Sequence, residues 1–130
     1  MNILGISAYY HDSAAALLQS GDISAAVQEE RFTRIKHDSS FPVRAIQYCL
    51  QASNLTFDEL DYIVYYESPR GKRRRFYSYL SSNPIMSLDE FTEIKSKGRL
   101  FKVDPISDIK ALQQKFGNPA KSIENKILFS

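Results

Sequence analysis

The chain has 130 residues, of which 43% are hydrophobic and 25% charged, so we expect one soluble, globular core. Its apolar runs are only a few residues long, far short of the roughly 20 that a membrane helix needs, and a signal peptide's basic and apolar regions are missing. The single cysteine, Cys49, excludes an intramolecular disulfide, and its apolar helical neighbours favour burial over catalysis. These features predict a cytoplasmic protein.

The net charge of +2 is unevenly distributed along the chain. Residues 1–65 carry 8 acidic and 4 basic side chains (−4), and residues 66–130 carry 7 acidic and 13 basic ones (+6). This difference predicts two parts with different surroundings. The total charge is too small to indicate a nucleic-acid-binding protein by its field alone.

Three short strands are predicted at the N-terminus. Residues 2–7, 13–19 and 23–28 form apolar runs that are separated by short polar connections. The two-residue link Gly21-Asp22 is typical of a tight hairpin. We therefore expect an antiparallel meander.

A helix is expected after the polar loop of residues 29–40. Pro42 suits the first helical turn, and residues 43, 46, 49 and 50 place apolar side chains on one face. We expect this helix at residues 42–53, with Ser39 or Ser40 as its N-cap and Asn54 as its stop. It should pack on the sheet.

A fourth strand is predicted at residues 61–66, where β-branched and aromatic residues follow a short helical turn at 57–60. A helix between two strands implies a crossover, which places the new strand parallel to a neighbour. The fold class is therefore α/β, with a three-stranded antiparallel meander followed by an α-β crossover.

The second half of the chain has a weaker pattern. Ser87 and Glu90 resemble a capping box, and residues 106–116 have helical spacing that Gly117-Asn118-Pro119 closes. Residues 126–129 begin a further apolar strand, where the sequence stops, so we expect a truncated domain. The predicted parts are a core subdomain at 1–67, a helical insertion at 68–125 and the start of a core strand at 126–130.

The first candidate site is the turn between the first two strands. Ser7 and Ser13 could present hydroxyl groups, and the turn its backbone N–H groups, to a phosphate. Asp12 could orient His11 and make it a better base. The alternative is an ordinary surface turn.

The second candidate site is the charged loop after the third strand. Arg31, Arg34 and Lys36 could bind a phosphate or carboxylate, while Glu30 could handle a hydroxyl proton. The alternative is a solvated loop with exposed ion pairs.

A third feature is the basic run at residues 70–75. It could contact an acidic partner or nucleic acid, or form a solvated face.

Several short motifs resemble, in order and at close spacing, the opening of one enzyme family. They are Gly5-Ile6, Tyr10-His11-Asp12-Ser13-Ala14-Ala15, Gln28-Glu29-Glu30-Arg31-Phe32-Thr33, Lys36-His37-Asp38 and Phe41-Pro42. The chain is similar here to the carbamoyltransferases of the nodulation-protein-U and antibiotic O-carbamoyltransferase type. Residues 61–67 and 126–130 continue the resemblance.

The resemblance implies the first subdomain of an actin-like ATPase (ribonuclease H-like) fold, incomplete here. It also implies transfer of a carbamoyl group from carbamoyl phosphate, through a carbamoyl-adenylate, to a sugar or antibiotic hydroxyl. The family's transfer-site residues fall on His11 and Lys36, with Asp12 as the orienting neighbour of His11. Ser7, Ser13, Glu30 and Arg31 are kept as the candidate substrate or phosphate contacts of the two sites described above. We expect His11 and Lys36 to approach each other across one cleft.

Family members use ATP and a divalent metal held by paired histidines, and these metal ligands are absent from this chain. We therefore expect the chain to be inactive alone and to need the remainder of the enzyme or self-association, with apolar surface exposed around residues 127–129. A non-catalytic binding or assembly module is the alternative. A nucleic-acid or membrane partner is not expected.

Overall fold

The computed structural model describes residues 1–68, 71, 74–75, 78, 81–82 and 104–130. Contacts group residues 1–66 and 105–130 into one compact unit and residues 67–104 into another. The predicted capping box of Ser87 and Glu90 lies outside the described residues, as does half of the basic run (residues 70, 72 and 73). No helix among the described residues is long and apolar enough to cross a membrane.

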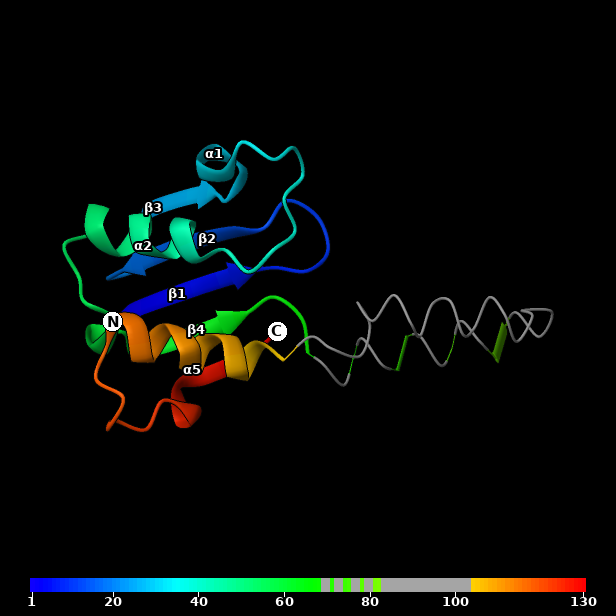
Figure 1. The fold of residues 1–130 in the computed structure, drawn as a ribbon. Helices are drawn as coiled ribbons and strands as arrows, with labels where there is room; N and C mark the ends of the chain where they lie inside the picture. Colours follow the sequence, from blue (N-terminus) through cyan, green and yellow to red (C-terminus); the bar gives the residue numbers. More distant parts are fainter. Residues whose placement is uncertain (69–70, 72–73, 76–77, 79–80, 83–103) are drawn as a thin grey trace. The chain divides into compact units, whose positions relative to one another are not determined.

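A five-stranded mixed sheet forms the centre of the first unit, in the order β3-β2-β1-β4-β5 (Figure 1). The strands are β1 (Asn2–Ser7), β2 (Ala14–Gln19), β3 (Asp22–Gln28), β4 (Tyr62–Tyr65) and β5 (Ile127–Phe129). The first three pair antiparallel, whereas β4 lies parallel to β1 and β5 parallel to β4. The predicted meander, crossover and late strand are confirmed.

The hairpin between β2 and β3 turns one residue earlier than predicted. Gln19 pairs with Asp22, so Ser20 and Gly21 form the two-residue link, and Asp22 already belongs to β3. Both link residues have positive φ angles, 53° and 93°. Tight hairpins favour such turns because their twist matches that of the strands.

The helical elements follow the predicted apolar spacing. They are α1 (Glu30–Thr33), α2 (Val43–Ala52), the 3-10 turn η1 (Phe57–Glu59), α5 (Pro105–Phe116) and the 3-10 turn η2 (Glu124–Lys126). Asn54 ends α2 as predicted: it has a φ of 53°, its N–H donates to the Gln51 carbonyl, and the Leu55 N–H donates to the Leu50 carbonyl. These two bonds satisfy carbonyls that the last helical turn leaves free.

The predicted serine cap of α2 is wrong. Neither Ser39 nor Ser40 caps the helix, whose N-cap is Pro42 and has no side-chain hydrogen bond. The first turn is instead closed by Glu29, whose carboxylate accepts from the N–H groups of Arg44 (3.2 Å) and Ala45 (2.7 Å). Glu29 is only 3% exposed. A buried carboxylate that lies 15 residues before Arg44 in the sequence therefore accepts the helix N–H groups that a serine hydroxyl was expected to accept.

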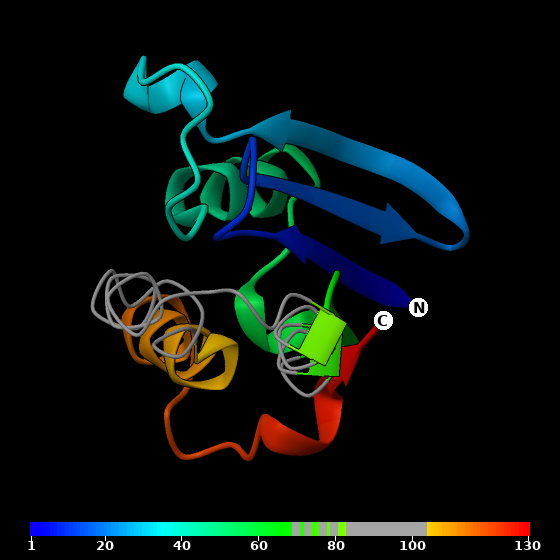
Figure 2. The same ribbon diagram turned by 90° about the vertical axis from the view of Figure 1, so that its right-hand side faces the viewer.

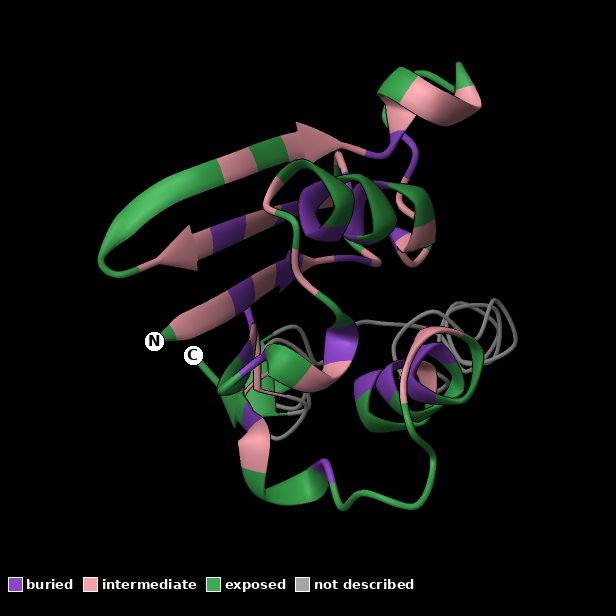
Figure 3. Cartoon of the chain, turned by 90° about the vertical axis from the view of Figure 1, so that its left-hand side faces the viewer, coloured by how far each residue is buried: buried purple, intermediate pink, exposed green. Residues whose placement is uncertain are grey.

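The core lies between the sheet and the helices α2 and α5, which cover the same face (Figure 2). Alternate strand residues point into it, among them Leu4, Leu17 and Ile63, and Ile46 and Ile109 meet them from the helices. Figure 3 shows this pattern as buried bands along the strands and the inner sides of the helices. Cys49 is buried in this core, as predicted, and burial raises the pKa of its thiol to about 11.

The helix α5 belongs to the unit of the sheet, although the sequence analysis includes it in an insertion at residues 68–125. It ends before Gly117, as predicted, where a side chain would crowd Asp58 and Phe57 at about 3 Å. In the last strand, Ile127 is buried, whereas Leu128 and Phe129 are 46% and 36% exposed. The predicted apolar surface is therefore present at two of its three residues.

Candidate functional site

Two loops at one end of the sheet lie side by side and carry four of the predicted site residues, His11, Asp12, Ser13 and Lys36, whereas Ser7 ends β1 and Glu30 and Arg31 lie in α1. The first is the turn of residues 8–13 between β1 and β2, and the second is the loop of residues 34–42 between α1 and α2. The Tyr9 N–H donates to the Ser39 carbonyl (2.7 Å), and the Ser13 N–H donates to the Asp38 carbonyl (2.8 Å). These backbone bonds join the turn to the loop, as a short sheet ladder would.

Asp38 organises the second loop from within. Its carboxylate accepts hydrogen bonds from the Ser40 hydroxyl (2.6 Å), the Ser40 N–H (2.9 Å) and the Thr33 hydroxyl (2.7 Å). These bonds favour the charged form, and they hold the pKa of the Asp38 carboxyl below its usual range. Asp38 is 7% exposed, so it serves as an internal brace of the loop.

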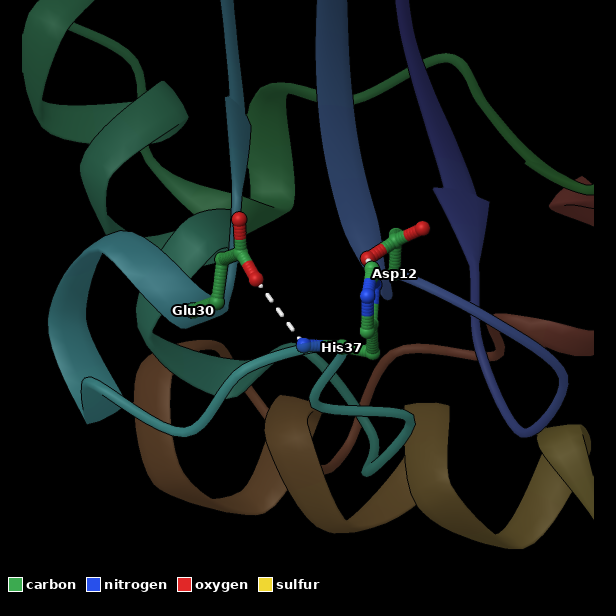
Figure 4. Close-up of side chains that lie close together, drawn as sticks. All are labelled: Asp12, Glu30 and His37. Carbon is green, nitrogen blue, oxygen red and sulfur yellow. Dashed lines mark hydrogen bonds and ion pairs between the residues drawn. The ribbon is translucent and has the colours of Figure 1, made fainter.

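Three side chains from separate segments meet where the two loops join (Figure 4). The His37 Nδ1 lies 2.8 Å from the Asp12 Oδ1, across the turn. The backbone N–H of His37 donates to the Glu30 Oε2 of α1 at 2.9 Å. Asp12 and His37 both have positive φ angles, 28° and 56°, a backbone conformation that residues other than glycine seldom adopt.

This cluster is the set of described residues with the geometry to hold a metal ion. The ligand atoms of Asp12, Glu30 and His37 lie within 4.8 Å of one another, and an imidazole with two carboxylates suits a divalent transition metal. However, the His37 Nδ1 and the Asp12 Oδ1 already bond to each other, and Arg31, Arg34 and Lys36 line the adjoining hollow with Glu30. We therefore assign no metal to the cluster.

The cluster should raise the pKa of His37 above its ordinary value of 6.5, chiefly through the hydrogen bond with Asp12, then through the charges of Asp12 and Glu30. Because the folded pKa is the higher one, the pair stabilises the fold fully below the unfolded pKa and loses its effect as pH rises through the folded pKa. An NMR titration of the His37 ring checks this, with the urea-unfolded chain as reference. Asp12→Asn should lower the pKa of His37 more than Glu30→Gln does. The opposite order would mean that Glu30, and not Asp12, is the main cause of the raised pKa.

The two residues expected to carry transfer lie next to this cluster in sequence. His11 precedes Asp12, is exposed, and contacts the Tyr10 ring, with ring centroids 4.2 Å apart. Lys36 precedes His37 and is exposed at the rim of a hollow of about 300 Å³. The structure thus brings together their neighbours, Asp12 and His37. The direct approach of His11 and Lys36 stays a prediction, as does the orientation of His11 by Asp12.

The hollow beside Lys36 is strongly basic and adjoins a larger, apolar cavity. The residues that line it are Glu30, Arg31, Arg34, Ile35 and Lys36. Arg31 also lines a cavity of about 630 Å³ on the sheet face opposite the helices, together with Ser7 and the small side chains of Ala14, Ala16 and Ala26. Arg31 therefore stands between a surface suited to anions and a surface suited to an apolar group.

Ser13 is placed differently from the other predicted phosphate contacts. It is fully buried, and its hydroxyl has no hydrogen-bond partner within the part of the chain that the structure describes. Its predicted contact with phosphate stays a prediction, and that contact would require the turn to open.

The sequence pattern assigns no role to His37, although this residue belongs to the Lys36-His37-Asp38 motif. The available signal was that each of the chain's two histidines stands next to an aspartate, His11-Asp12 and His37-Asp38. In the folded chain the pairing crosses between the loops, from His37 to Asp12. Such an exchange of partners requires knowledge of which loops are neighbours in space.

Comparison with known proteins identifies the chain's relatives. The sequence matches the family described as "Carbamoyltransferase N-terminus" over residues 2–113. The nodulation protein NolNO of Sinorhizobium fredii is 36% identical over 92 residues, which cover 71% of this chain and 14% of the relative. An uncharacterised protein of Synechocystis is 66% identical over 68 residues, which cover 52% of this chain and 11% of the relative.

A 19.2 kDa uncharacterised protein of Rhizobium etli is 42% identical over 60 residues, which cover 46% of this chain and 35% of the relative. The chain thus spans only between 11% and 35% of the length of these three relatives. The family match itself is extensive, because it runs from β1 into α5 and includes both loops of the site. The chain belongs to the carbamoyltransferase N-terminal family.

Proposed function

We propose that this chain supplies part of the transfer site of an O-carbamoyltransferase, with the acceptor hydroxyl on a sugar or an antibiotic. The observation that carries the proposal is the pairing of Asp12 with His37 inside the family match. This bond joins the turn that holds His11 to the loop that holds Lys36. Two segments that are 25 residues apart in sequence can then act on one substrate.

The sheet supports the finer proposal of an actin-like, ribonuclease H-like first subdomain. An antiparallel meander that continues through a helix into parallel strands, in the order β3-β2-β1-β4-β5, is the arrangement expected for the first part of that fold. In α/β sheets, ligands bind beyond the carboxyl ends of the parallel strands. The carboxyl end of β1 leads directly into the turn of residues 8–13.

In the proposed reaction, the acceptor oxygen forms a bond to the carbamoyl carbon, while the bond from this carbon to the donor's phosphate oxygen breaks. His11 accepts the proton of the hydroxyl group, a role for which its exposed imidazole is accessible to a substrate. Lys36 and Arg31 stabilise the negative charge on the leaving phosphate group. Asp12 keeps its place as the proposed orienting neighbour, since its second carboxylate oxygen is not bonded to His37.

The cofactors implied by the resemblance fit this chain to different degrees. ATP supplies the phosphate through which the carbamoyl group is activated, and the basic hollow with Arg31, Arg34 and Lys36 suits such a phosphate. The paired histidines that the resemblance assigns to the divalent metal are not among the residues of this chain, whose His11 and His37 belong to other motifs. No step of the reaction is therefore assigned to that metal.

We further propose that the chain has no transfer activity alone and works with the remainder of an enzyme, or with a second copy. The edge strand β5 exposes Leu128 and Phe129, which suits pairing with another segment. A cytoplasmic location agrees with the reduced, buried thiol of Cys49.

The experiment is a carbamoyl-transfer assay with three samples: this chain alone, a full-length family member, and a chimera in which residues 1–130 replace the matching segment of that member. Labelled carbamoyl phosphate and ATP serve as donors, and sugars or aminoglycosides as acceptors. We expect turnover by the chimera and none by the chain alone. In the chimera, His11→Ala and Lys36→Ala should each lower kcat by about 10²- to 10⁴-fold.

Lys121→Ala is the matched control, because Lys121 is also exposed but lies in the segment between α5 and η2. It should leave turnover unchanged. An active chimera that tolerates both His11→Ala and Lys36→Ala would refute the transfer site and favour the binding-module alternative. Turnover by the chain alone would refute its proposed dependence on a partner.

A further inference from the structure

The contact between Asp12 and His37 is a feature that general acid-base chemistry at His11 does not explain. Each partner stands directly after a residue proposed for transfer: Asp12 follows His11, and His37 follows Lys36. The 2.8 Å hydrogen bond between their side chains therefore links the turn and the loop at the positions directly beside the two proposed groups. Loss of this bond would release the backbone next to His11 and next to Lys36 from each other.

The cluster is held on both sides by the rest of the fold. On the loop side, the Glu30 carboxylate accepts from the His37 N–H, and the loop is braced by Asp38. On the turn side, the Tyr9 hydroxyl donates to the Asp108 carboxylate of α5 at 2.5 Å, which anchors the start of the turn. Backbone bonds from Tyr9 and Ser13 to the loop fix the two ends of the turn, and the Asp12 side chain contacts the loop from the segment between them, residues 10–12.

We propose that Asp12, His37 and Glu30 form a clasp that positions His11 and Lys36 for carbamoyl transfer, with His37 as a positioning residue. The inference rests on the proposed function of the same site. The exposed positions of Asp12 and His37, whose side chains are 36% and 63% accessible, make a large contribution of the pair to folding stability implausible. Both Asp12 and His37 have a left-handed backbone conformation, which has a local cost in conformational energy. A positioning role explains why the fold keeps it.

The charges around His37 give the clasp a pH dependence. The carboxylates that face it are Asp12 from the turn and Glu30 from α1, and Lys36 and Asp38 flank it in the chain. Protonation of His37 turns its bond to Asp12 into a charge-assisted one, which is shorter and stronger. The clasp is therefore tighter at the lower end of the neutral range and looser above the pKa of His37.

A distance measurement on the chain itself tests the clasp without any assay of transfer. Spin labels at Tyr10→Cys and Ile35→Cys, both exposed positions, report the separation of the turn and the loop in a Cys49→Ala background. We expect a narrow distance distribution that broadens in His37→Ala and in Asp12→Ala. The control Asp22→Ala, an exposed aspartate at the start of β3, should leave it narrow.

Kinetics of the chimera then test what the clasp does. His37→Ala should lower kcat by up to about 100-fold, since a misplacement of about 1 Å can have that effect, with a smaller change in the KM of the acceptor. His37→Gln, whose amide N–H can still donate to Asp12, should recover most of the loss and remove the limb of the pH profile that His37 contributes. The urea midpoint of unfolding should be nearly the same for the unaltered chimera and for its His37→Ala and His37→Gln variants.

The outcomes separate the two proposals. If His11→Ala and Lys36→Ala abolish transfer while His37→Ala changes neither the distance distribution nor kcat, the clasp is refuted and the transfer site stands. If His37→Ala broadens the distance distribution but leaves kcat unchanged, His37 holds the two loops together without positioning the transfer groups, and the proposed positioning role is refuted. Should His11→Ala and Lys36→Ala prove silent, the transfer site fails, and the clasp falls with it as a catalytic device.

Discussion

Truncation of Ile46 to alanine should destabilise the fold by about 2–5 kcal/mol, the range for removing a large aliphatic side chain from a packed core. Ile46 is fully buried on the inner face of α2, where this helix packs on β2 and β3. The change removes three methyl or methylene groups and leaves a space that the surrounding strands can fill only in part. Urea unfolding followed by circular dichroism gives the free energy of unfolding.

Ile23→Ala is the matched control, because Ile23 lies on β3 but is 69% exposed. It should change the free energy of unfolding by no more than about 0.5 kcal/mol. If Ile46→Ala proves too unstable to purify, Ile46→Val should still show a loss of about 0.5–1.5 kcal/mol. Equal effects of Ile46→Ala and Ile23→Ala would mean that α2 does not cover the sheet as described.

Much of the fold follows from the sequence because its patterns are local and periodic. The apolar face of α2 repeats every three to four residues, and the strands alternate between core and surface, so that Leu4 and Leu17 turn toward the helices. Stop signals were equally readable, since Asn54 and Gly117 end their helices by backbone geometry and by a lack of space. The hairpin was misplaced by one residue because Ser20 and Gly21 are as good a turn pair as Gly21 and Asp22.

The candidate site was less predictable because its contacts are not local. The roles of Asp12 in orienting His11 and of Glu30 in handling a hydroxyl proton stay predictions. What the sequence does not indicate is that the Asp12 side chain contacts His37 of the other loop and that the Glu30 carboxylate accepts from the His37 backbone N–H. These pairings depend on which side chains of the two neighbouring loops meet, and the spacing of residues along the chain does not encode that.

The cap of α2 shows the same limit. A serine just before a helix is the usual local signal, and two serines stand there, at positions 39 and 40. The Ser40 hydroxyl instead donates to Asp38, and the Ser39 carbonyl accepts from Tyr9. The N–H groups of Arg44 and Ala45 therefore need another acceptor, which is Glu29 at the end of β3.

Glu29→Ala should consequently destabilise the fold by about 1–3 kcal/mol, the cost of leaving the buried Ala45 N–H and the partly buried Arg44 N–H without their acceptor. The loss should be local as well, with faster hydrogen exchange of the Arg44 and Ala45 amides, measured by NMR. Glu29→Gln should lose less, because its carbonyl oxygen can still accept from one of the two N–H groups, whereas the NH₂ group in place of the other oxygen can only donate.

Two variants serve as controls for this prediction. Ser39→Ala tests the cap expected from the sequence and should change the free energy of unfolding by no more than about 0.5 kcal/mol. Glu59→Ala removes a glutamate that also accepts from a backbone N–H, that of Thr56, but is exposed, so water can replace it at a smaller cost. A Ser39→Ala effect as large as that of Glu29→Ala would return the cap to the serine. If Glu29→Ala matched Glu59→Ala, burial would not be the reason for its importance.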